Sequence, residues 1–97
     1  MKIAFSREAV ARLEEQVNYL RDAYAPEAAE RLKDRVLSFV GKHLANFPRV
    51  GHKLMQHDLW EIWVPKTRLV LWYKIKGDTL VIVTVWHNAQ DRASSIE

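Results

Sequence analysis

Arg68 and His87 are the side chains of this sequence whose chemistry and expected placement point most directly to a function. A guanidinium offers a rigid fork of donors to a phosphate or carboxylate, and an imidazole exchanges protons near neutral pH. Gly77-Asp78 has glycine first, as a two-residue type II′ hairpin turn prefers, and counting back from that turn places Arg68 opposite His87. The pair predicts a phosphate or carboxylate site, unless both side chains only solvate the ends of their strands.

The two predicted strands of this hairpin, residues 68–76 and 79–87, alternate between two faces. One face is expected to pack on helices and consists of Leu69, Leu71, Tyr73, Ile75, Leu80, Ile82, Thr84 and Trp86. The face on which a partner is expected to dock consists of Arg68, Val70, Trp72, Lys74, Val81, Val83, Val85 and His87. Since Tyr73 is assigned to the core, it is not expected to act as a catalytic acid.

A further predicted strand, residues 59–64, brings Glu61 and Trp63 to the docking face. A two-residue turn at 65–66 would place Trp63 opposite Arg68. A three-residue loop with a bulge would shift that register, so both pairings stay open.

Charge is distributed unevenly along the chain. The formal net charge of +3 is too small by itself to indicate nucleic-acid binding. Residues 35–57 nevertheless contain no acidic side chain, and Arg49 and Lys53 lie within this run. Such a run favours an acidic partner, although a solvated basic helix end and loop would have the same composition. Asp91 and Arg92 either form a local ion pair or cover the site.

Hydrophobic spacing predicts two helices, residues 7–24 and 26–47, because apolar side chains recur there every three or four positions. Pro26 suits the first position of the second helix, and Pro48 ends it. Strands are predicted at residues 2–5, 59–64, 68–76 and 79–87, with a loop over 48–58. The order β-α-α-β-β-β predicts an α+β fold, in which a helical hairpin packs on one face of a small, mainly antiparallel sheet.

The length of 97 residues corresponds to one domain, residues 1–97. The chain has no cysteine and no apolar run approaching the ~20 residues of a membrane helix, which predicts a soluble cytoplasmic protein without a membrane contact. His52 and His57 have no third ligand at a useful spacing, so no metal is expected. The sequence has no glycine-rich phosphate loop, and no cofactor is expected.

Four segments, in this order, resemble the RelE/ParE toxin superfamily of bacterial type II toxin–antitoxin modules. They are Ile3-Ala4-Phe5-Ser6 leading into Ala9 and Leu13, Phe47-Pro48-Arg49-Val50-Gly51, Arg68-Leu69-Val70-Leu71-Trp72-Tyr73-Lys74-Ile75, and Val83-Thr84-Val85-Trp86-His87-Asn88-Ala89-Gln90-Asp91. The ending, residues 85–92, is similar to the ParE branch, whose members are often described as plasmid stabilisation proteins. This resemblance implies a toxin that inhibits DNA gyrase by binding it, arrests growth, and is neutralised by a cognate antitoxin.

The RelE branch implies a different activity, metal-free cleavage of mRNA in the ribosomal A site, for which Arg68 and His87 would be catalytic. Where RelE-like nucleases place lysines on the first hairpin strand, this chain has Glu61 and Trp63, and no tyrosine follows His87. These departures favour gyrase over the ribosome and mRNA as the target. The third alternative is a superfamily member that has lost toxicity and acts as a binding module.

The resemblance also implies two contact surfaces. The residues expected to bind the target are Arg49, Lys53, Glu61, Trp63, Arg68, Trp72, Lys74, His87, Asp91 and Arg92. The antitoxin is expected to pack a helix on Leu13, Val17, Leu20, Leu32 and Val36. It is also expected to add a strand to an exposed sheet edge, either residues 59–64 or the first strand. A homodimer or a toxin–antitoxin hetero-oligomer is expected.

Overall fold

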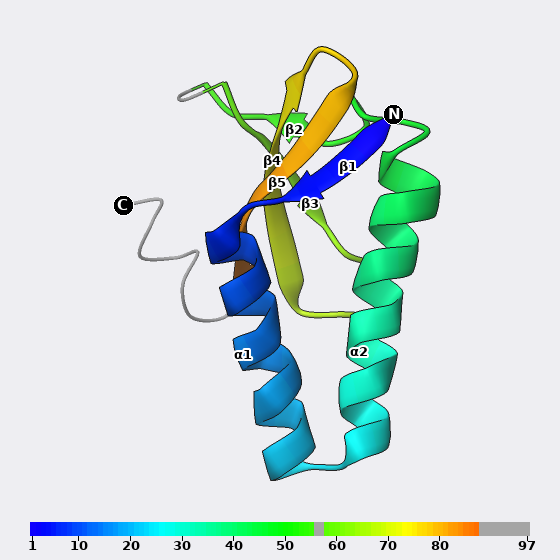
Figure 1. Cartoon of the computed structure of the whole chain (residues 1–97), viewed down its shortest axis with the longest axis vertical. Helices are drawn as coiled ribbons and strands as arrows, with labels where there is room; N and C mark the ends of the chain where they lie inside the picture. Colours follow the sequence, from blue (N-terminus) through cyan, green and yellow to red (C-terminus); the bar gives the residue numbers. More distant parts are fainter. Residues whose placement is uncertain (56–57, 88–97) are drawn as a thin grey trace.

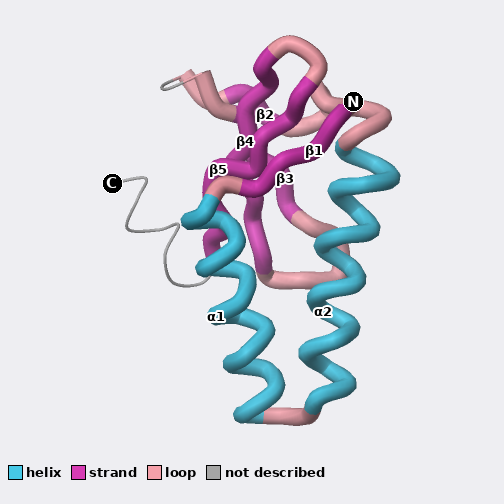
Figure 2. Tube along the Cα trace, viewed as in Figure 1, coloured by secondary structure: helices cyan, strands magenta, loops and turns pink. Residues whose placement is uncertain are grey.

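A helical hairpin covers one face of a five-stranded sheet in this computed structural model, which describes residues 1–55 and 58–87 (Figures 1 and 2). The elements are β1 (Lys2–Phe5), α1 (Arg7–Ala23), α2 (Pro26–Ser38), the π-helical turn η1 (Phe39–Leu44), β2 (His52–Lys53), β3 (Trp60–Trp63), β4 (Leu69–Lys76) and β5 (Thr79–His87). The predicted α+β class and element order are confirmed. The expectation of an entirely irregular segment over 48–58 is wrong, because β2 lies within it.

The strands lie in the order β1-β5-β4-β3-β2. β1 runs parallel to β5, with Phe5 beside Ile82, and the other neighbouring strands are antiparallel. The outer strands are therefore β1 and β2. Of the two edges predicted for strand addition, residues 2–5 lie at the border of the sheet, whereas β3 lies between β4 and β2.

Ser6 joins the sheet to the first helix. Its backbone N–H donates to the carbonyl oxygen of Ile82 over 2.9 Å, and its hydroxyl donates to the carbonyl oxygen of Val83. The same hydroxyl accepts from the backbone N–H of Ala9 over 3.0 Å, which caps α1. The chain thus leaves β1 and enters α1 while still attached to β5.

The β4–β5 hairpin turns at Gly77 as predicted, but its register changes halfway along. The predicted pairs are confirmed from Lys76↔Thr79 through Tyr73↔Ile82. A bulge follows, so that Trp72 pairs with Thr84 and Leu69 pairs with His87. The prediction that Arg68 lies directly opposite His87 is therefore wrong by one residue. The extra residue is Val83, whose carbonyl oxygen is bound by Ser6 where β1 ends.

The bulge also exchanges the two faces of β5 beyond Ile82. Val85 is 2% exposed and belongs to the core, although alternation assigned it to the docking face. Trp86 instead lies against Trp72, with ring centroids 5.2 Å apart, on the sheet face away from the helices, here called the open face. Thr84 is buried, but it pairs with Trp72 and therefore lies on the open face rather than on the helix side to which it was assigned.

The helical layer forms the other wall of the core. α1 ends at Ala23, one residue before the predicted end, and α2 ends as an α-helix at Ser38 before continuing as η1. The buried apolar side chains that these elements and the sheet share are Ala9, Leu13, Val17, Ala29, Val36, Val40, Leu44, Val64, Leu69, Leu71, Tyr73, Leu80, Ile82 and Val85. The apolar side chains that recur every three or four residues in the helices thus pack with those of the sheet in a single core.

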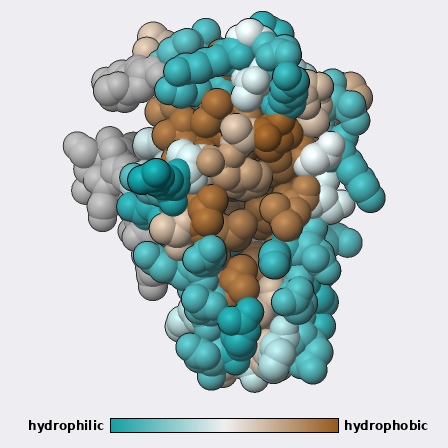
Figure 3. Space-filling view, in the orientation of Figure 1, coloured by the Kyte–Doolittle hydropathy of each residue, from teal (hydrophilic) through white to brown (hydrophobic). Residues whose placement is uncertain are grey.

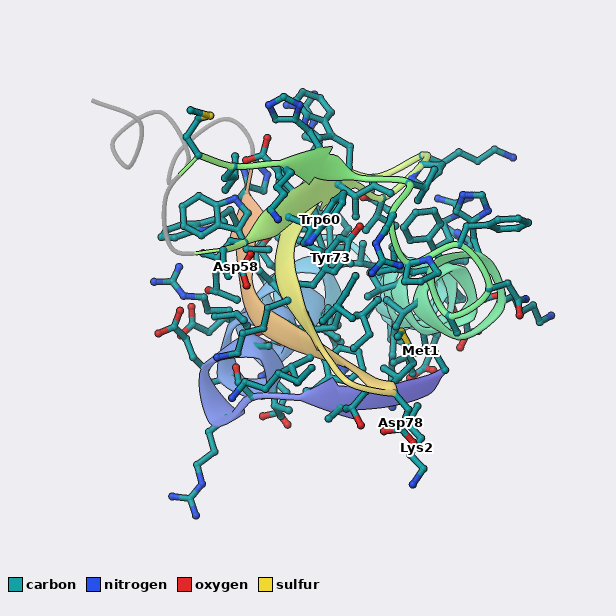
Figure 4. All side chains as sticks on the ribbon, turned by 90° about the horizontal axis from the view of Figure 1, so that it is seen from above. Met1, Lys2, Asp58, Trp60, Tyr73 and Asp78 are labelled. Atoms are coloured by element: carbon teal, nitrogen blue, oxygen red, sulfur yellow. The ribbon has the colours of Figure 1, made fainter. Side chains whose placement is uncertain are left out.

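Tyr73, at the centre of the sheet, fixes the irregular segment that follows η1. Its buried hydroxyl donates to the carbonyl oxygen of Pro48 over 2.8 Å and accepts from the backbone N–H of Gly51 over 3.1 Å. Its ring is nearly parallel to that of Trp60, with centroids 6.2 Å apart, and Figure 4 labels the two residues next to each other. A Cβ at Gly51 would lie 2.6 Å from this hydroxyl, so the close approach requires glycine.

We expect Tyr73→Phe to lower the free energy of unfolding by about 2 kcal/mol, because the change leaves two backbone groups without their partner. Urea denaturation followed by fluorescence measures this difference. Tyr19→Phe is the control, since Tyr19 is 60% exposed, and it should change stability little. Equal stability of the two variants would contradict the anchoring role.

Burial also makes stability depend on pH through Tyr73. Desolvation raises the pKa of this phenol above 10.0, only partly opposed by the Gly51 N–H. The folded state therefore holds the proton more tightly than the unfolded chain does. The resulting stability is complete below pH 10 and declines as the pH rises through the folded pKa. The difference in unfolding free energy between wild type and Tyr73→Phe should shrink over that range, and a constant difference would contradict this assignment.

Candidate functional site

The side chains predicted to bind a target occupy three separate places. Glu61, Trp63, Trp72 and Lys74 lie on strands that form the open face. Arg49 and Lys53 lie near the other end of the sheet. Arg68 and His87 line a cleft beside the helices. Asp91 and Arg92 lie outside the described residues. The residues predicted to form one target-binding surface therefore belong to three separate surfaces, and each surface has its own chemistry.

The open face is aromatic at its centre. Glu61 is only 8% exposed and accepts a hydrogen bond from the Trp72 indole N–H over 2.8 Å. Trp86 packs edge-on against Trp72, and the Arg12 guanidinium of α1 lies 4.4 Å from the centroid of the Trp86 ring. Trp63 is half-exposed beside this cluster. Such a surface suits packing against another protein better than binding of a phosphate chain.

Arg49 and Lys53 share a small pocket with Trp60 and Asp58. Lys53 pairs across the sheet with Trp60, and its ammonium lies 5.6 Å from the centroid of that ring. The same ammonium lies 3.3 Å from an Asp58 carboxylate oxygen. Lys53 is therefore already partnered, and its alternation with His52 places it on the opposite side of the sheet from the open face.

Arg68 and His87 remain near each other although they are not cross-strand partners. Because the bulge reverses the alternation of β5, His87 lies on the helix side, opposite Leu69. A cavity of about 260 Å³ contains both residues between the hairpin of helices and the loop that joins β3 to β4. Its lining consists of Gln16, Tyr19, Leu20, Ala28, Arg31, Leu32, Arg35, Lys66, Thr67, Arg68, Leu69 and His87. We call this cavity the basic cleft.

Sequence reasoning missed Arg31, Arg35 and Lys66 as partners of Arg68. The two arginines are four residues apart, so they project from one side of α2, to which no role was assigned. Lys66 belongs to a loop whose length the sequence left open, and the backbone N–H of Val64 closes it by donating to the carbonyl oxygen of Leu69 over 3.0 Å. The resulting register places Trp63 opposite Val70 rather than Arg68.

The residues predicted to contact an antitoxin are largely part of the core. Leu13, Val17 and Val36 are buried, and Leu20 and Leu32 are half-buried. Leu20 and Leu32 line the basic cleft, whereas Leu13 and Val17 line a second cavity on the outer side of the helical hairpin. Val36 is fully buried, so it cannot contact an antitoxin directly.

The second cavity is an apolar groove of about 320 Å³ between α1 and α2. Val10 and Leu37, each 42% exposed, line it together with Phe5 from the end of β1. Figure 3 shows the apolar side chains that gather on this side of the molecule. Arg21 and Lys33 add charge at the groove. Its shape and composition suit an amphipathic helix.

Within residues 1–55 and 58–87, no group of three or more histidine, aspartate or glutamate side chains is arranged to hold a metal ion. In the same part of the chain, no helix is sufficiently long and apolar to cross a membrane.

Comparison with known proteins agrees with this architecture. No curated protein sequence matches the chain. A structure of the chromosomal ParDE toxin–antitoxin system from P. aeruginosa is similar over 90% of this chain and 95% of its own, with a TM-score of 0.77 and 17% identity. A structure of the RelBE2 toxin–antitoxin complex from Mycobacterium tuberculosis is similar over 89% and 95%, with a TM-score of 0.61 and 22% identity.

These two likenesses show a shared fold. The family described as the ParE toxin of the type II toxin–antitoxin system parDE matches residues 3–92, which is most of the sequence. The chain therefore belongs to the ParE toxin family of type II toxin–antitoxin systems.

Proposed function

We propose that this protein inhibits DNA gyrase by binding it, and that a cognate antitoxin neutralises it. The observation that carries the proposal is the match to the ParE toxin family over residues 3–92, because the ParE branch is the one that resemblance links to gyrase. The open face adds physical support. Its half-exposed Trp63 and the neighbouring tryptophan cluster are of the kind that protein interfaces use as anchors.

Cleavage of RNA is the second candidate, and one observation favours it: Arg68 and His87 line the same cleft. Metal-free cleavage requires a base, an acid and a cation near the reacting phosphate. The first hairpin strand, however, carries Glu61 bound to Trp72 where RelE-like nucleases place lysines. Binding without chemistry requires only a shaped surface, so gyrase inhibition is the simpler function for these residues.

The antitoxin has two complementary docking features on this protein. The apolar groove between α1 and α2 suits a helix, and β1 lies at the border of the sheet, where an added strand can pair. Both features meet at Phe5, which ends β1 and lines the groove. One antitoxin segment can therefore contact both without a long connection.

Purified wild-type protein is expected to inhibit supercoiling by DNA gyrase and to leave mRNA intact in a ribosomal translation assay. Trp63→Ala should raise the concentration needed for half-inhibition about tenfold or more, as loss of an interface anchor does. The matched control is Tyr24→Ala, because Tyr24 is 72% exposed at the end of α1, away from the open face.

The alternatives give different results in the same assays. Cuts in mRNA at the ribosomal A site that disappear in Arg68→Gln, with supercoiling unaffected, would replace the proposal with endoribonuclease activity. Normal growth on expression, together with no effect in either assay, would identify a non-toxic binding module. Circular dichroism of each variant distinguishes loss of folding from loss of contact.

A further inference from the structure

The pocket around Trp60 is separate from the surfaces used in the proposed function. Its volume is about 370 Å³, and it shares no lining residue with the basic cleft or the apolar groove. Gly77 of the β4–β5 turn lines it, and Figure 1 shows this turn and the connection between α1 and α2 at opposite ends of the molecule. The full lining is Arg49, Lys53, Asp58, Trp60, Ile75 and Gly77. We call this site the turn pocket.

Arg49 lies in the turn pocket on a backbone that is fixed on both sides. The buried hydroxyl of Tyr73 binds the carbonyl oxygen of Pro48 over 2.8 Å and the backbone N–H of Gly51 over 3.1 Å. The residues before and after Arg49 are thus anchored to the centre of the sheet. In the part of the chain that the structure describes, the ion pairs do not include Arg49. Its guanidinium is therefore a positioned cation whose donors are available to a ligand.

Lys53 is the second cation of the turn pocket, and its pairing with Trp60 across the sheet positions it. Its ammonium lies 3.3 Å from an Asp58 carboxylate oxygen. An ammonium has three donors, so Lys53 can keep this partner and still donate to a ligand. Two cations face one carboxylate in the lining, which leaves the pocket with a net positive charge. This balance favours an anionic group.

The apolar wall of the turn pocket is formed by Trp60 and Ile75, which are both half-buried. The Trp60 ring is nearly parallel to that of Tyr73, with centroids 6.2 Å apart, so the core fixes its orientation. An indole supplies a broad apolar surface on which a flat ring can pack, and proteins use such surfaces to hold the bases of nucleotides. The wall therefore favours a ligand that carries a ring beside its anionic group.

Asp58 adds a hydrogen-bond acceptor to the turn pocket. Its φ angle of 52° lies in the left-handed region, which few residues other than glycine, asparagine and aspartate adopt. Residues held in such conformations concentrate at functional sites. An ionised carboxylate only accepts hydrogen bonds and repels a second anion. Asp58 therefore disfavours a compact polyanion and favours a ligand that has hydroxyl or amino donors close to a single anionic group.

We propose that the turn pocket binds a nucleoside 5′-monophosphate. Its base packs against Trp60, its phosphate pairs with Arg49 and Lys53, and its sugar hydroxyls donate to Asp58. The volume of about 370 Å³ is within the range of about 300–1,000 Å³ that small-molecule pockets have, and a lone inorganic anion would leave much of it unfilled. The nucleotide is either free or the first residue of a strand that has a 5′-phosphate, since both carry the same chemical group.

The test titrates the purified, isotope-labelled full chain with AMP and follows its N–H signals by two-dimensional NMR. The indole N–H of Trp60 and the backbone N–H of Gly77 are expected to shift, whereas the indole N–H of Trp63 on the open face is not. Adenosine and inorganic phosphate should each bind about tenfold or more weakly than AMP, because each lacks one part of the ligand. Equal affinity for AMP and inorganic phosphate, or shifts confined to the open face, would overturn the proposal.

Arg49→Gln should weaken AMP binding about tenfold or more, because it removes a charge-assisted contact with the phosphate. The matched control is Lys42→Gln, which removes the same charge from the same acid-free run of residues but lies outside the pocket lining. It should change the affinity less than about twofold. Both side chains are exposed, and the NMR spectrum of each variant verifies its fold. Equal effects of the two substitutions, or no binding of AMP by wild type, would contradict the assignment.

A short oligonucleotide, with and without a 5′-phosphate, distinguishes the two sources of the ligand. Tighter binding of the phosphorylated strand than of AMP would assign the pocket to strand ends, and equal affinity would assign it to the free nucleotide. Equal binding of the two strands would overturn the proposal, because the terminal phosphate would then contribute nothing. None of these measurements requires gyrase or an antitoxin, so their failure would leave the proposed function unaffected.

Discussion

The attachment of Ser6 to β5 is the interaction on which the remaining arrangement depends. Its backbone N–H binds the carbonyl oxygen of Ile82, and its hydroxyl binds that of Val83 while capping α1. These bonds occur where β1 ends, and the register of the β4–β5 pair changes at the same place. One serine thus couples the start of a helix to a bulge, and the bulge decides which side of the sheet the end of β5 presents.

Two sides of the protein acquire different properties as a result. Trp86 joins Trp72 on the open face and makes it aromatic, whereas His87 joins Arg68 and the α2 arginines at the basic cleft. Without the extra residue, the imidazole would lie on the open face and the indole in the core. The separation of an aromatic surface from a cationic one is therefore a property of the backbone as much as of composition.

Much of the fold could be predicted from the sequence because its signals are local. Gly77 defines the turn, and counting from it is right as far as Tyr73 and Ile82. Beyond that point the sequence of β5 is compatible with either alternation of its side chains between the two faces, because Val83 and Val85 are equally suited to both faces. The hydrogen bond to the carbonyl oxygen of Val83, where this alternation changes, comes from Ser6, which is far away in the sequence, and no local pattern reveals it.

The candidate sites were less predictable for a similar reason. Arg31 and Arg35 have the spacing of an ordinary solvated helix face, and only the tertiary arrangement brings Lys66 and Arg68 to them. β2 consists of two residues, too few for alternation to be recognised. Its position depends on the segment anchored by Tyr73, whose partners are backbone atoms, so the residue type that reflects this contact is Gly51.

The parallel pairing of β1 with β5 has a consequence for biosynthesis. Among the described residues, β1 pairs with residues 79–82 alone, so the sheet stays open until β5 has emerged from the ribosome. During translation α1 and α2 can pair locally, but the surface formed by β5 does not yet exist. Any surface to which β5 contributes, the tryptophan pair of the open face included, therefore forms only after residue 87 has been synthesised.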